Sequence, residues 1–157
     1  MQVADIMSRD VQFVSPDATA QEAATLMGEL DVGALPVGSP DDLQGIVTDR
    51  DLLFRVVADA REAGVRVREV MSRTVFTCVP ADSIAAAMDL MGAYHIRRLP
   101  VVDETRRVIG WVSLTDLSRR LLQDSGAIRQ ALEEVSGSPE VEGDVKAAVQ
   151  SNHDVSG

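Results

Sequence analysis

The amino-acid sequence contains one pattern twice, and both copies keep their apolar residues and turn residues in the same order. The spacing is 64 residues for the first two segments and 65 residues for the last. The matching segments are Met7 to Arg9 with Met71 to Arg73, Leu35 to Val37 with Leu99 to Val101, and residues 45–52 with residues 110–117. Such a repeat indicates two copies of one supersecondary unit. A copy of about 55 residues buries little surface alone, so we expect a packed pseudo-two-fold pair.

Each copy shows the same series of local patterns. Extended residues before Pro16 and Pro80 favour a short strand that stops at the proline. Apolar residues at helical spacing then favour helices from about Ala20 and Ile84. The candidate N-cap residues are Asp17 or Thr19 in the first copy and Asp82 or Ser83 in the second. Two further strands and a helix follow, at residues 34–37, 45–48 and 49–62 and at residues 99–102, 108–113 and 115–123. We therefore predict an α/β (α+β) fold in which the order strand, helix, strand, strand, helix occurs twice.

Composition narrows the class of protein. Hydrophobic residues make up 45% of the chain and aromatic residues 3%, so we expect an aliphatic core. The single cysteine, Cys78, excludes an internal disulfide and a cysteine-based metal cluster. The sequence has no stretch of 18 continuous apolar residues and no charged start followed by an apolar run, so we expect a cytoplasmic protein without a membrane partner. A net charge of −10 argues against a nucleic-acid surface.

The region after the second copy differs from both repeats. A helical stripe covers about residues 125–135, and residues 136–157 are rich in Gly, Ser and acidic side chains. The predicted organisation is a first repeat at residues 1–62, a second at residues 67–123, and a C-terminal helix with a flexible acidic tail at residues 124–157.

Four short motifs resemble those of a tandem pair of CBS domains, also called a Bateman module; three recur in both copies, and the first has Glu69-Val70-Met71 as its counterpart in the second copy. They are D-x-M (Asp5-Ile6-Met7 in the first copy), a P-D or P-x-D turn before the first helix, L-P-V on the next strand, and a final G-h-h-[TS]-x-x-D, where h is apolar. The resemblance covers roughly residues 3–122 and is closest to stand-alone bacterial CBS-pair proteins. Since the sequence has no nucleophile elbow, phosphate-binding P-loop or histidine pair at metal spacing, we expect no enzyme activity and no metal site.

The resemblance implies a regulatory sensor. Such modules bind adenosine-containing ligands such as AMP, ADP, ATP, S-adenosylmethionine or NADH in clefts between the two copies. It also implies a homodimer, a disc of four CBS units, which signals to a regulated partner protein. The alternative is a dimeric interaction or scaffold protein whose nucleotide clefts are vestigial.

The residues themselves indicate where a nucleotide would bind. Thr48 ends a strand and Asp51 lies in the first turn of the next helix, where a hydroxyl, free amides and a carboxylate can meet phosphate and ribose. Ser113 and Asp116 repeat this arrangement. Strand alternation places Ile46 on the face of Thr48 and Trp111 on the face of Ser113. Simple helix capping explains the same residues, although capping and binding are compatible.

The resemblance adds residues from the opposite copy to each cleft. Arg97 and Arg98 match a family position that often carries phosphate-binding side chains, whereas an exposed pair matched by surface acids is the alternative. Trp111 either stacks on adenine or fills its own pocket. The preferred site comprises Ile46, Thr48, Asp51, Val79, Ile84, Arg97 and Arg98. The second site comprises Ser15, Ala20, Trp111, Ser113 and Asp116.

Overall fold

The computed structural model describes residues 1–126, 130, 133 and 134 of the chain. Residues Met1–Leu117 form one compact unit that contains nearly all of both repeats, and a second unit begins at Ser118. The predicted helix at residues 125–135 falls mostly outside the described residues, and the predicted acidic tail lies wholly outside them. Within the described part of the chain, no helix has the length and hydropathy needed to cross a membrane.

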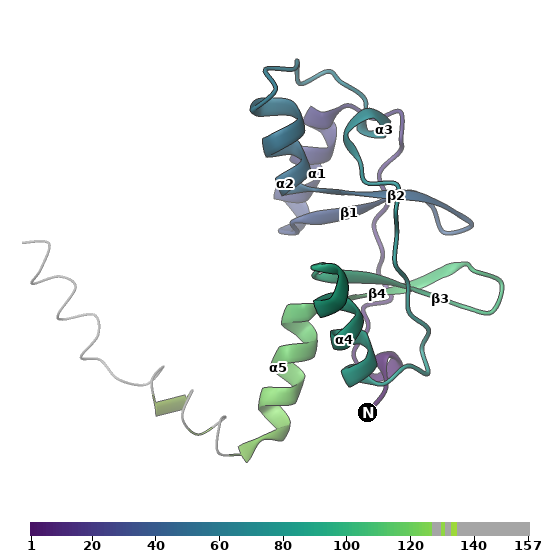
Figure 1. The fold of residues 1–157 in the computed structure, drawn as a ribbon, viewed down its shortest axis with the longest axis vertical. Helices are drawn as coiled ribbons and strands as arrows, with labels where there is room; N and C mark the ends of the chain where they lie inside the picture. Colours follow the sequence, from purple (N-terminus) through teal and green to yellow (C-terminus); the bar gives the residue numbers. More distant parts are fainter. Residues whose placement is uncertain (127–129, 131–132, 135–157) are drawn as a thin grey trace, which may run out of the picture. The chain divides into compact units, whose positions relative to one another are not determined.

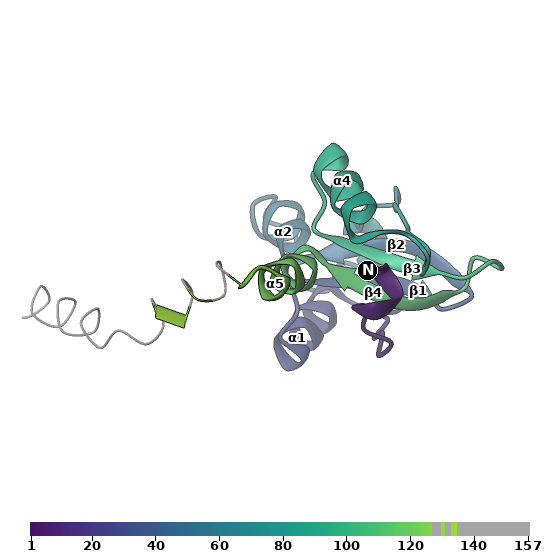
Figure 2. The ribbon, with the colours of Figure 1, turned by 90° about the horizontal axis from the view of Figure 1, so that it is seen from below.

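Each repeat contains a two-stranded antiparallel sheet, formed by the second and third of its three predicted strands. In the first repeat β1 (Ala34–Ser39) pairs with β2 (Asp42–Thr48), and in the second β3 (Arg98–Val102) pairs with β4 (Val108–Ser113). The two hairpins lie one above the other with their turns at the same end (Figures 1 and 2). A hydrogen bond of 2.9 Å from the Val108 amide to the Pro40 carbonyl links them.

The first long helix of each repeat begins at a hydroxyl side chain. Helix α1 (Ala20–Leu30) follows Thr19, whose side chain accepts the Glu22 amide, and α4 (Ile84–Tyr94) follows Ser83, which accepts the Ala86 amide. These bonds identify Thr19 and Ser83 as the N-caps, in preference to Asp17 and Asp82. Both helices bury one apolar stripe, which consists of Ala20, Ala23 and Met27 in α1 and of Ile84, Ala87 and Met91 in α4.

The predicted first strand of each repeat is reduced to a single parallel bridge. Val14 bridges Val37, and Cys78 bridges Val101. Val14 donates its amide to the Pro36 carbonyl at 3.0 Å and accepts the Gly38 amide at 3.0 Å, which completes the bridge. The ladder stops there because Pro16, two residues further on, has no amide proton to continue it.

The N-terminal segment of each repeat packs into the core of the other. Val3, in the short helix η1 (Val3–Asp5), belongs to the core of the second repeat, and Val67, in α3 (Val67–Val70), belongs to the core of the first. The backbone bonds are reciprocal: the Val3 amide reaches the Asp82 carbonyl and the Val67 amide reaches the Ala18 carbonyl, both at 2.8 Å. The two repeats of the sequence are therefore interlocked in space.

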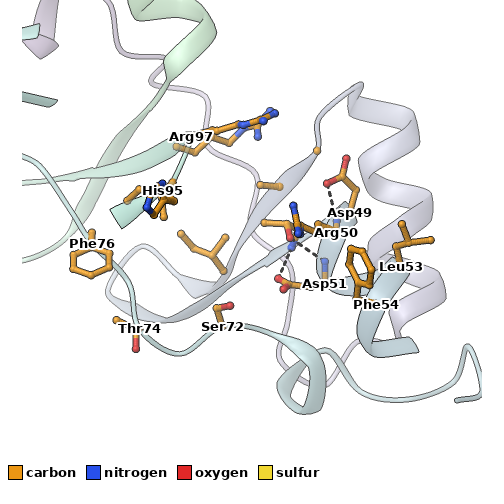
Figure 3. A pocket seen from close by; sticks show the side chains of 16 residues that line it. Asp49, Arg50, Asp51, Leu53, Phe54, Ser72, Thr74, Phe76, His95 and Arg97 are labelled. Carbon is orange, nitrogen blue, oxygen red and sulfur yellow. Dashed lines mark hydrogen bonds between the residues drawn. The ribbon is translucent and has the colours of Figure 1, made fainter. Parts of the chain in front are cut away.

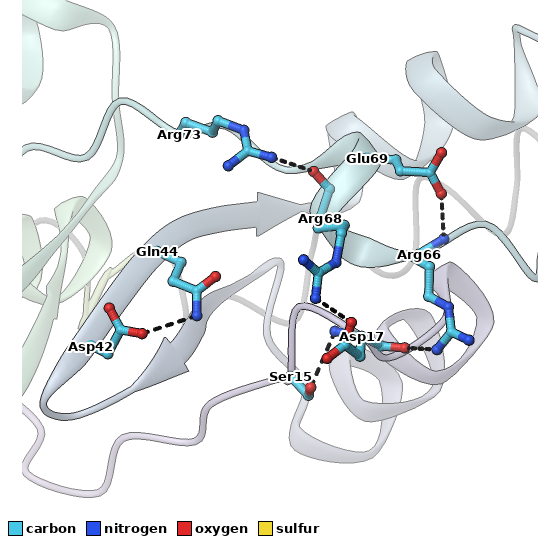
Figure 4. Close-up of polar contacts among 8 residues, drawn as sticks. All are labelled: Ser15, Asp17, Asp42, Gln44, Arg66, Arg68, Glu69 and Arg73. Carbon is cyan, nitrogen blue, oxygen red and sulfur yellow. Dashed lines mark hydrogen bonds and ion pairs between the residues drawn. The ribbon is translucent and has the colours of Figure 1, made fainter.

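Polar contacts strengthen one of these exchanges (Figure 4). The guanidinium groups of Arg66 and Arg68 contact the turn before α1, where they bind the carbonyl oxygen and the carboxylate of Asp17. The Arg66 amide in turn donates to the Glu69 carboxylate at 3.2 Å. The segment before the second repeat is thereby fixed to the first repeat.

The second helix differs between the repeats. In the first repeat α2 (Asp49–Leu52) continues as a wide turn, η2 (Leu53–Val57), and ends near Ala60, whose φ is 53°. This end precedes the predicted one at residue 62, because the left-handed conformation at Ala60 cannot continue a right-handed helix. In the second repeat α5 (Leu114–Asp124) has no such wide turn.

Candidate functional site

A pocket of about 1080 Å³ lies between the two repeats, inside the compact unit (Figure 3). Five of the seven residues predicted for the preferred site line it. The first repeat contributes Ile46, Thr48 and Asp51, and the second contributes Arg97 and Arg98. The fold thus brings the Thr48 hydroxyl and the Asp51 carboxylate to the same pocket as two guanidinium groups that lie 46 or more residues further along the sequence.

Thr48 and Asp51 form a reciprocal cap at the start of α2. The Asp51 amide donates to Thr48 Oγ1 at 3.0 Å, and the Thr48 amide donates to Asp51 Oδ2 at 2.9 Å. The Asp51 side chain keeps 14% of its surface exposed, and its other oxygen, Oδ1, lies 3.8 Å from Arg55 Nε. Among the described residues, the Thr48 hydroxyl has no acceptor for its own proton. Capping therefore leaves hydrogen-bonding capacity at the pocket wall.

Arg97 and Arg98 supply the positive charge that the second repeat brings to the pocket. Within the described part of the chain, neither guanidinium forms an ion pair with a carboxylate. The expected alternative, in which surface acids pair with them, is therefore not what the described residues show. Arg98 lies directly opposite Ser113 across β3 and β4, so these two side chains share a face of the sheet.

Apolar and aromatic residues form further walls of the pocket. Phe76 and Ile96 line it beside Ile46, and the Phe76 ring stacks on Tyr94 with centroids 3.9 Å apart. Phe76, Ile96 and His95 were not among the residues predicted for the site. The nearest indication was position: His95 and Ile96 directly precede the selected arginines.

Two residues predicted for the preferred site do not line this pocket. Ile84 is 3% exposed and belongs to the core of the second repeat, and Val79 lies on the surface at 42% exposure. Ile84 is held inward because it begins the buried stripe of α4. The polar and charged residues predicted for this site thus line the pocket, whereas two of the three predicted apolar residues do not.

Comparison with known proteins agrees with this architecture. The model of the CBS domain family matches residues 3–58 and 67–123. The chain belongs to the CBS-domain family. It is 41% identical over 125 residues to the CBS domain-containing protein YhcV of Bacillus subtilis, a match that covers 80% of this chain and 89% of YhcV. The predicted resemblance and the predicted fold class are confirmed.

Solved structures of CBS proteins share the fold. A putative signal-transduction protein with CBS domains from Burkholderia ambifaria has a TM-score of 0.75 at 34% identity, covering 80% of this chain and 96% of that one. The CBS domain pair of protein MJ0100, solved in complex with 5′-methylthioadenosine and S-adenosylmethionine, has a TM-score of 0.72 at 28% identity, covering 80% and 98%. The family therefore includes pairs that bind adenosyl ligands.

The second CBS repeat presents its polar pair differently. Ser113 Oγ donates to Asp116 Oδ2 at 2.7 Å and accepts the Asp116 amide at 3.1 Å, so the two side chains are bonded to each other. Trp111 is half-buried, and its backbone bridges that of Ser8. Among the other residues predicted for this site, Ala20 is 4% exposed in the core of the first repeat, and Ser15 is exposed and accepts the Asp17 amide.

The single cysteine has a structural role in the second CBS repeat. Cys78 is buried, and burial, together with the charge of Asp82, raises the pKa of its thiol to about 12. Its Sγ lies 3.8 Å from the Pro100 carbonyl oxygen. The thiol therefore stays protonated and unreactive at neutral pH.

Proposed function

We propose that this CBS pair is a regulatory ligand-binding protein without a catalytic step of its own. It binds an adenosine-containing nucleotide of the AMP, ADP or ATP class in the pocket between the repeats and signals to a partner protein. The observation that carries the proposal is the pair of guanidinium groups, Arg97 and Arg98, which line the same pocket as Thr48 and Asp51. A homodimer is part of the proposal.

The pocket offers each part of a nucleotide a suitable surface. Asp51 can accept the ribose hydroxyls, since Oδ1 is occupied only by a contact of 3.8 Å with Arg55. Ile46, Phe76 and Ile96 provide an apolar wall for the base. Arg97 and Arg98 form no ion pair with a carboxylate among the described residues, and a guanidinium bonded to phosphate contributes about 1.5–3 kcal/mol.

The charge of the pocket favours a ligand that carries phosphate. The ligands of the MJ0100 pair, 5′-methylthioadenosine and S-adenosylmethionine, support an adenosyl group in this family. Neither of them carries a phosphate for Arg97 and Arg98 to bind. We therefore rank AMP, ADP and ATP above S-adenosylmethionine, with NADH as a further phosphate-bearing candidate.

Isothermal titration calorimetry with AMP, ADP, ATP, NADH, S-adenosylmethionine and adenosine tests the proposal. We expect binding of at least one phosphate-bearing ligand, weakened about tenfold or more by Asp51→Ala. Asp116→Ala is the matched control because it occupies the equivalent position in the second repeat. If Asp116→Ala abolishes binding and Asp51→Ala does not, the preferred site is wrong.

The same titrations address the alternative function. An interaction or scaffold protein with vestigial clefts would bind none of these ligands at millimolar concentration and would show no thermal stabilisation by them. Such a result would indicate that the protein acts through its exposed surfaces, as an interaction or scaffold protein.

A further inference from the structure

A third arginine lines the pocket, and it comes from the first repeat. Arg50 lies in the first turn of α2, is exposed, and lines the same pocket as Arg97 and Arg98 (Figure 3). Among the described residues, its guanidinium forms no ion pair with a carboxylate. The equivalent position of the second repeat is Thr115, so the shared fold does not require an arginine here. Arg50 is therefore available to a ligand in the pocket.

An aromatic ring holds the Arg50 side chain beside the pocket. The guanidinium carbon lies 5.2 Å from the centroid of the Phe54 ring, a distance at which a cation is attracted to the face of the ring. Phe54 also lines the pocket. This contact uses no oxygen acceptor, so the N–H groups of the guanidinium remain able to donate to phosphate oxygens. Arg50 is thus positioned without being neutralised.

The polar residues of the pocket differ in their exposure to solvent. Thr48, Asp51 and Arg98 are half-buried, whereas Arg97 and Arg50 are exposed. A ribose bound by Asp51 and a phosphate bound by Arg98 therefore lie deeper than a group bound by Arg50. The two exposed arginines come from different repeats, so they can contact the outer part of a ligand from two walls of the pocket (Figure 3).

The size of the pocket allows a ligand longer than a nucleoside monophosphate. Its volume is about 1080 Å³. Pockets for small molecules usually measure roughly 300–1,000 Å³, so this one lies at the large end. A guanidinium can bind two oxygens of one phosphate group through parallel N–H bonds. Three guanidinium groups in one pocket therefore match a chain of phosphates better than a single phosphate.

Two carboxylates in the same pocket are already bonded to backbone amides at the start of α2. Asp49 Oδ1 accepts the Arg50 amide at 2.8 Å, and Asp51 Oδ2 accepts the Thr48 amide at 2.9 Å. The three arginines outnumber these two aspartates among the residues that line the pocket. The local charge is therefore positive, and it favours the ligand with the larger negative charge.

We propose that Arg50 selects nucleotides by the length of their phosphate chain, so that the pocket binds ATP more tightly than ADP and ADP more tightly than AMP. This inference rests on the proposed nucleotide-binding function. Arg98 binds the phosphate next to the ribose, and Arg97 and Arg50 bind the outer phosphates from two walls of the pocket. The preferred ligand is therefore a nucleoside triphosphate, and Arg50 is the residue that distinguishes it from a monophosphate.

Isothermal titration calorimetry of the full chain with AMP, ADP and ATP tests this selection. The titrations are made in EDTA and 0.15 M salt, where distant charges are screened. We expect ATP to bind at least about tenfold more tightly than AMP. Arg50→Gln should lower the ATP affinity about five- to tenfold and the AMP affinity less than about twofold, because AMP has no outer phosphate. Thermal unfolding without ligand checks that the variant is folded.

Two further variants separate a local contact from general effects. Arg9→Gln makes the same change in net charge at an exposed arginine that does not line the pocket, and it should leave both affinities unchanged. Phe54→Leu keeps an apolar side chain but removes the ring that positions Arg50. We expect it to lower the ATP affinity about two- to threefold and to leave the AMP affinity unchanged.

Each outcome decides one part of the proposal. Equal binding of AMP and ATP, or equal losses of both in Arg50→Gln, overturns selection by Arg50 and leaves nucleotide binding intact. A loss in Arg9→Gln as large as that in Arg50→Gln assigns the preference to net charge and overturns the selection as well. An unchanged ATP affinity in Phe54→Leu overturns the positioning role of the ring. If no adenine nucleotide binds, the proposed function fails, and the selection fails with it.

Discussion

The two strand-to-helix junctions of this protein share a backbone design but differ in what their side chains leave available. At both junctions the aspartate amide donates to the preceding hydroxyl, at 3.0 Å for Asp51 and Thr48 and at 3.1 Å for Asp116 and Ser113. The Ser113 hydroxyl also donates a hydrogen bond to Asp116 Oδ2 at 2.7 Å. Thr48 has no such acceptor among the described residues. Equal sequence motifs therefore produce unequal binding capacity.

The surroundings enlarge this difference. Positions 33 and 34 of the first repeat are glycine and alanine, and positions 97 and 98 of the second are arginines. A Cβ added at Gly33 would lie 3.0 Å from Asp49 Oδ2, the end of an exposed side chain, so a larger residue there requires Asp49 to move. The first repeat thus supplies the polar junction and Arg50 to the pocket, and the second supplies Arg97 and Arg98.

The largest expected effect concerns the interlocked cores. A Cβ at Gly45 would lie 2.6 Å from the Ser72 backbone oxygen, whereas a Cβ at Gly110 would lie 2.7 Å from the flexible thioether of Met7. A backbone atom moves less easily than the end of a side chain. Gly45→Ala should therefore lower the free energy of unfolding by about 2–3 kcal/mol, and Gly110→Ala by about 1 kcal/mol. Urea unfolding measures both.

Gly92→Ala is the control for these glycine substitutions. No atom lies within 4 Å of its added Cβ, and the residue is inside α4. We expect its unfolding free energy to stay the same or to rise by up to about 1 kcal/mol. Equal losses for Gly45→Ala and Gly110→Ala would contradict the asymmetry of the two exchanged contacts.

The cations supplied by the second repeat should have the next largest effect. The double substitution Arg97→Gln and Arg98→Gln is expected to lower ADP affinity about 10- to 100-fold, because both guanidinium groups line the pocket. Adenosine carries no phosphate, so its binding should change less than about twofold. Calorimetry with Arg106→Gln as an exposed-arginine control separates a local effect from a change in net charge. A parallel loss for adenosine would argue against a phosphate-binding role.

The strand and helix order of each repeat could be predicted from sequence because it depends on local patterns. Apolar residues at helical spacing predicted α1 and α4, each with two candidate N-caps, and turn-rich stretches separated the predicted strands. The exchange of Val3 and Val67 between the cores was not predictable, since it depends on contacts between residues distant in sequence. The wide turn in η2 likewise left no local pattern that distinguishes it from an ordinary helix.

The pocket shows the same limit. Charged and hydroxyl residues next to Pro, Gly and strand ends could be located by motif, and Thr48, Asp51, Arg97 and Arg98 line one cavity. Ile46 was placed by strand alternation, but Phe76 and Ile96 could not be predicted, because a core residue and a pocket residue share the same chemistry. Ile84 was selected and is buried, whereas Phe76 was not selected and lines the pocket.

The hydroxyl difference between the junctions should produce a smaller effect. Thr48→Val and Ser113→Ala each remove a cap and should each cost about 1 kcal/mol of stability, measured by thermal unfolding. Only Thr48→Val is expected to weaken ADP binding, about fivefold, because the Thr48 hydroxyl proton is available to a ligand. If Ser113→Ala weakens ADP binding equally, the second junction binds nucleotide as well.

The smallest predicted effect concerns a residue that positions Asp51 without lining the pocket. Arg55 donates to the carbonyl oxygens of Val70 and Met71 at 2.9 and 3.1 Å, and its Nε lies 3.8 Å from Asp51 Oδ1. Its side chain is 48% exposed, so the ion pair itself contributes little. Arg55→Gln is therefore expected to lower ADP affinity about two- to threefold, because the Asp51 carboxylate is then held less firmly in position.

Arg55→Lys separates the two roles of this side chain. Lysine keeps the charge, but it has a single nitrogen and cannot approach Asp51 as Nε does while binding both carbonyl oxygens as Nη1 does. If geometry matters, Arg55→Lys behaves like Arg55→Gln in calorimetry; full rescue by lysine would instead assign the effect to charge. The equivalent residue of the second repeat, Arg120, lies 4.0 Å from Asp124 in a simple exposed ion pair. Arg120→Gln should leave ADP affinity unchanged, because its partner is a surface carboxylate and not the aspartate of a pocket.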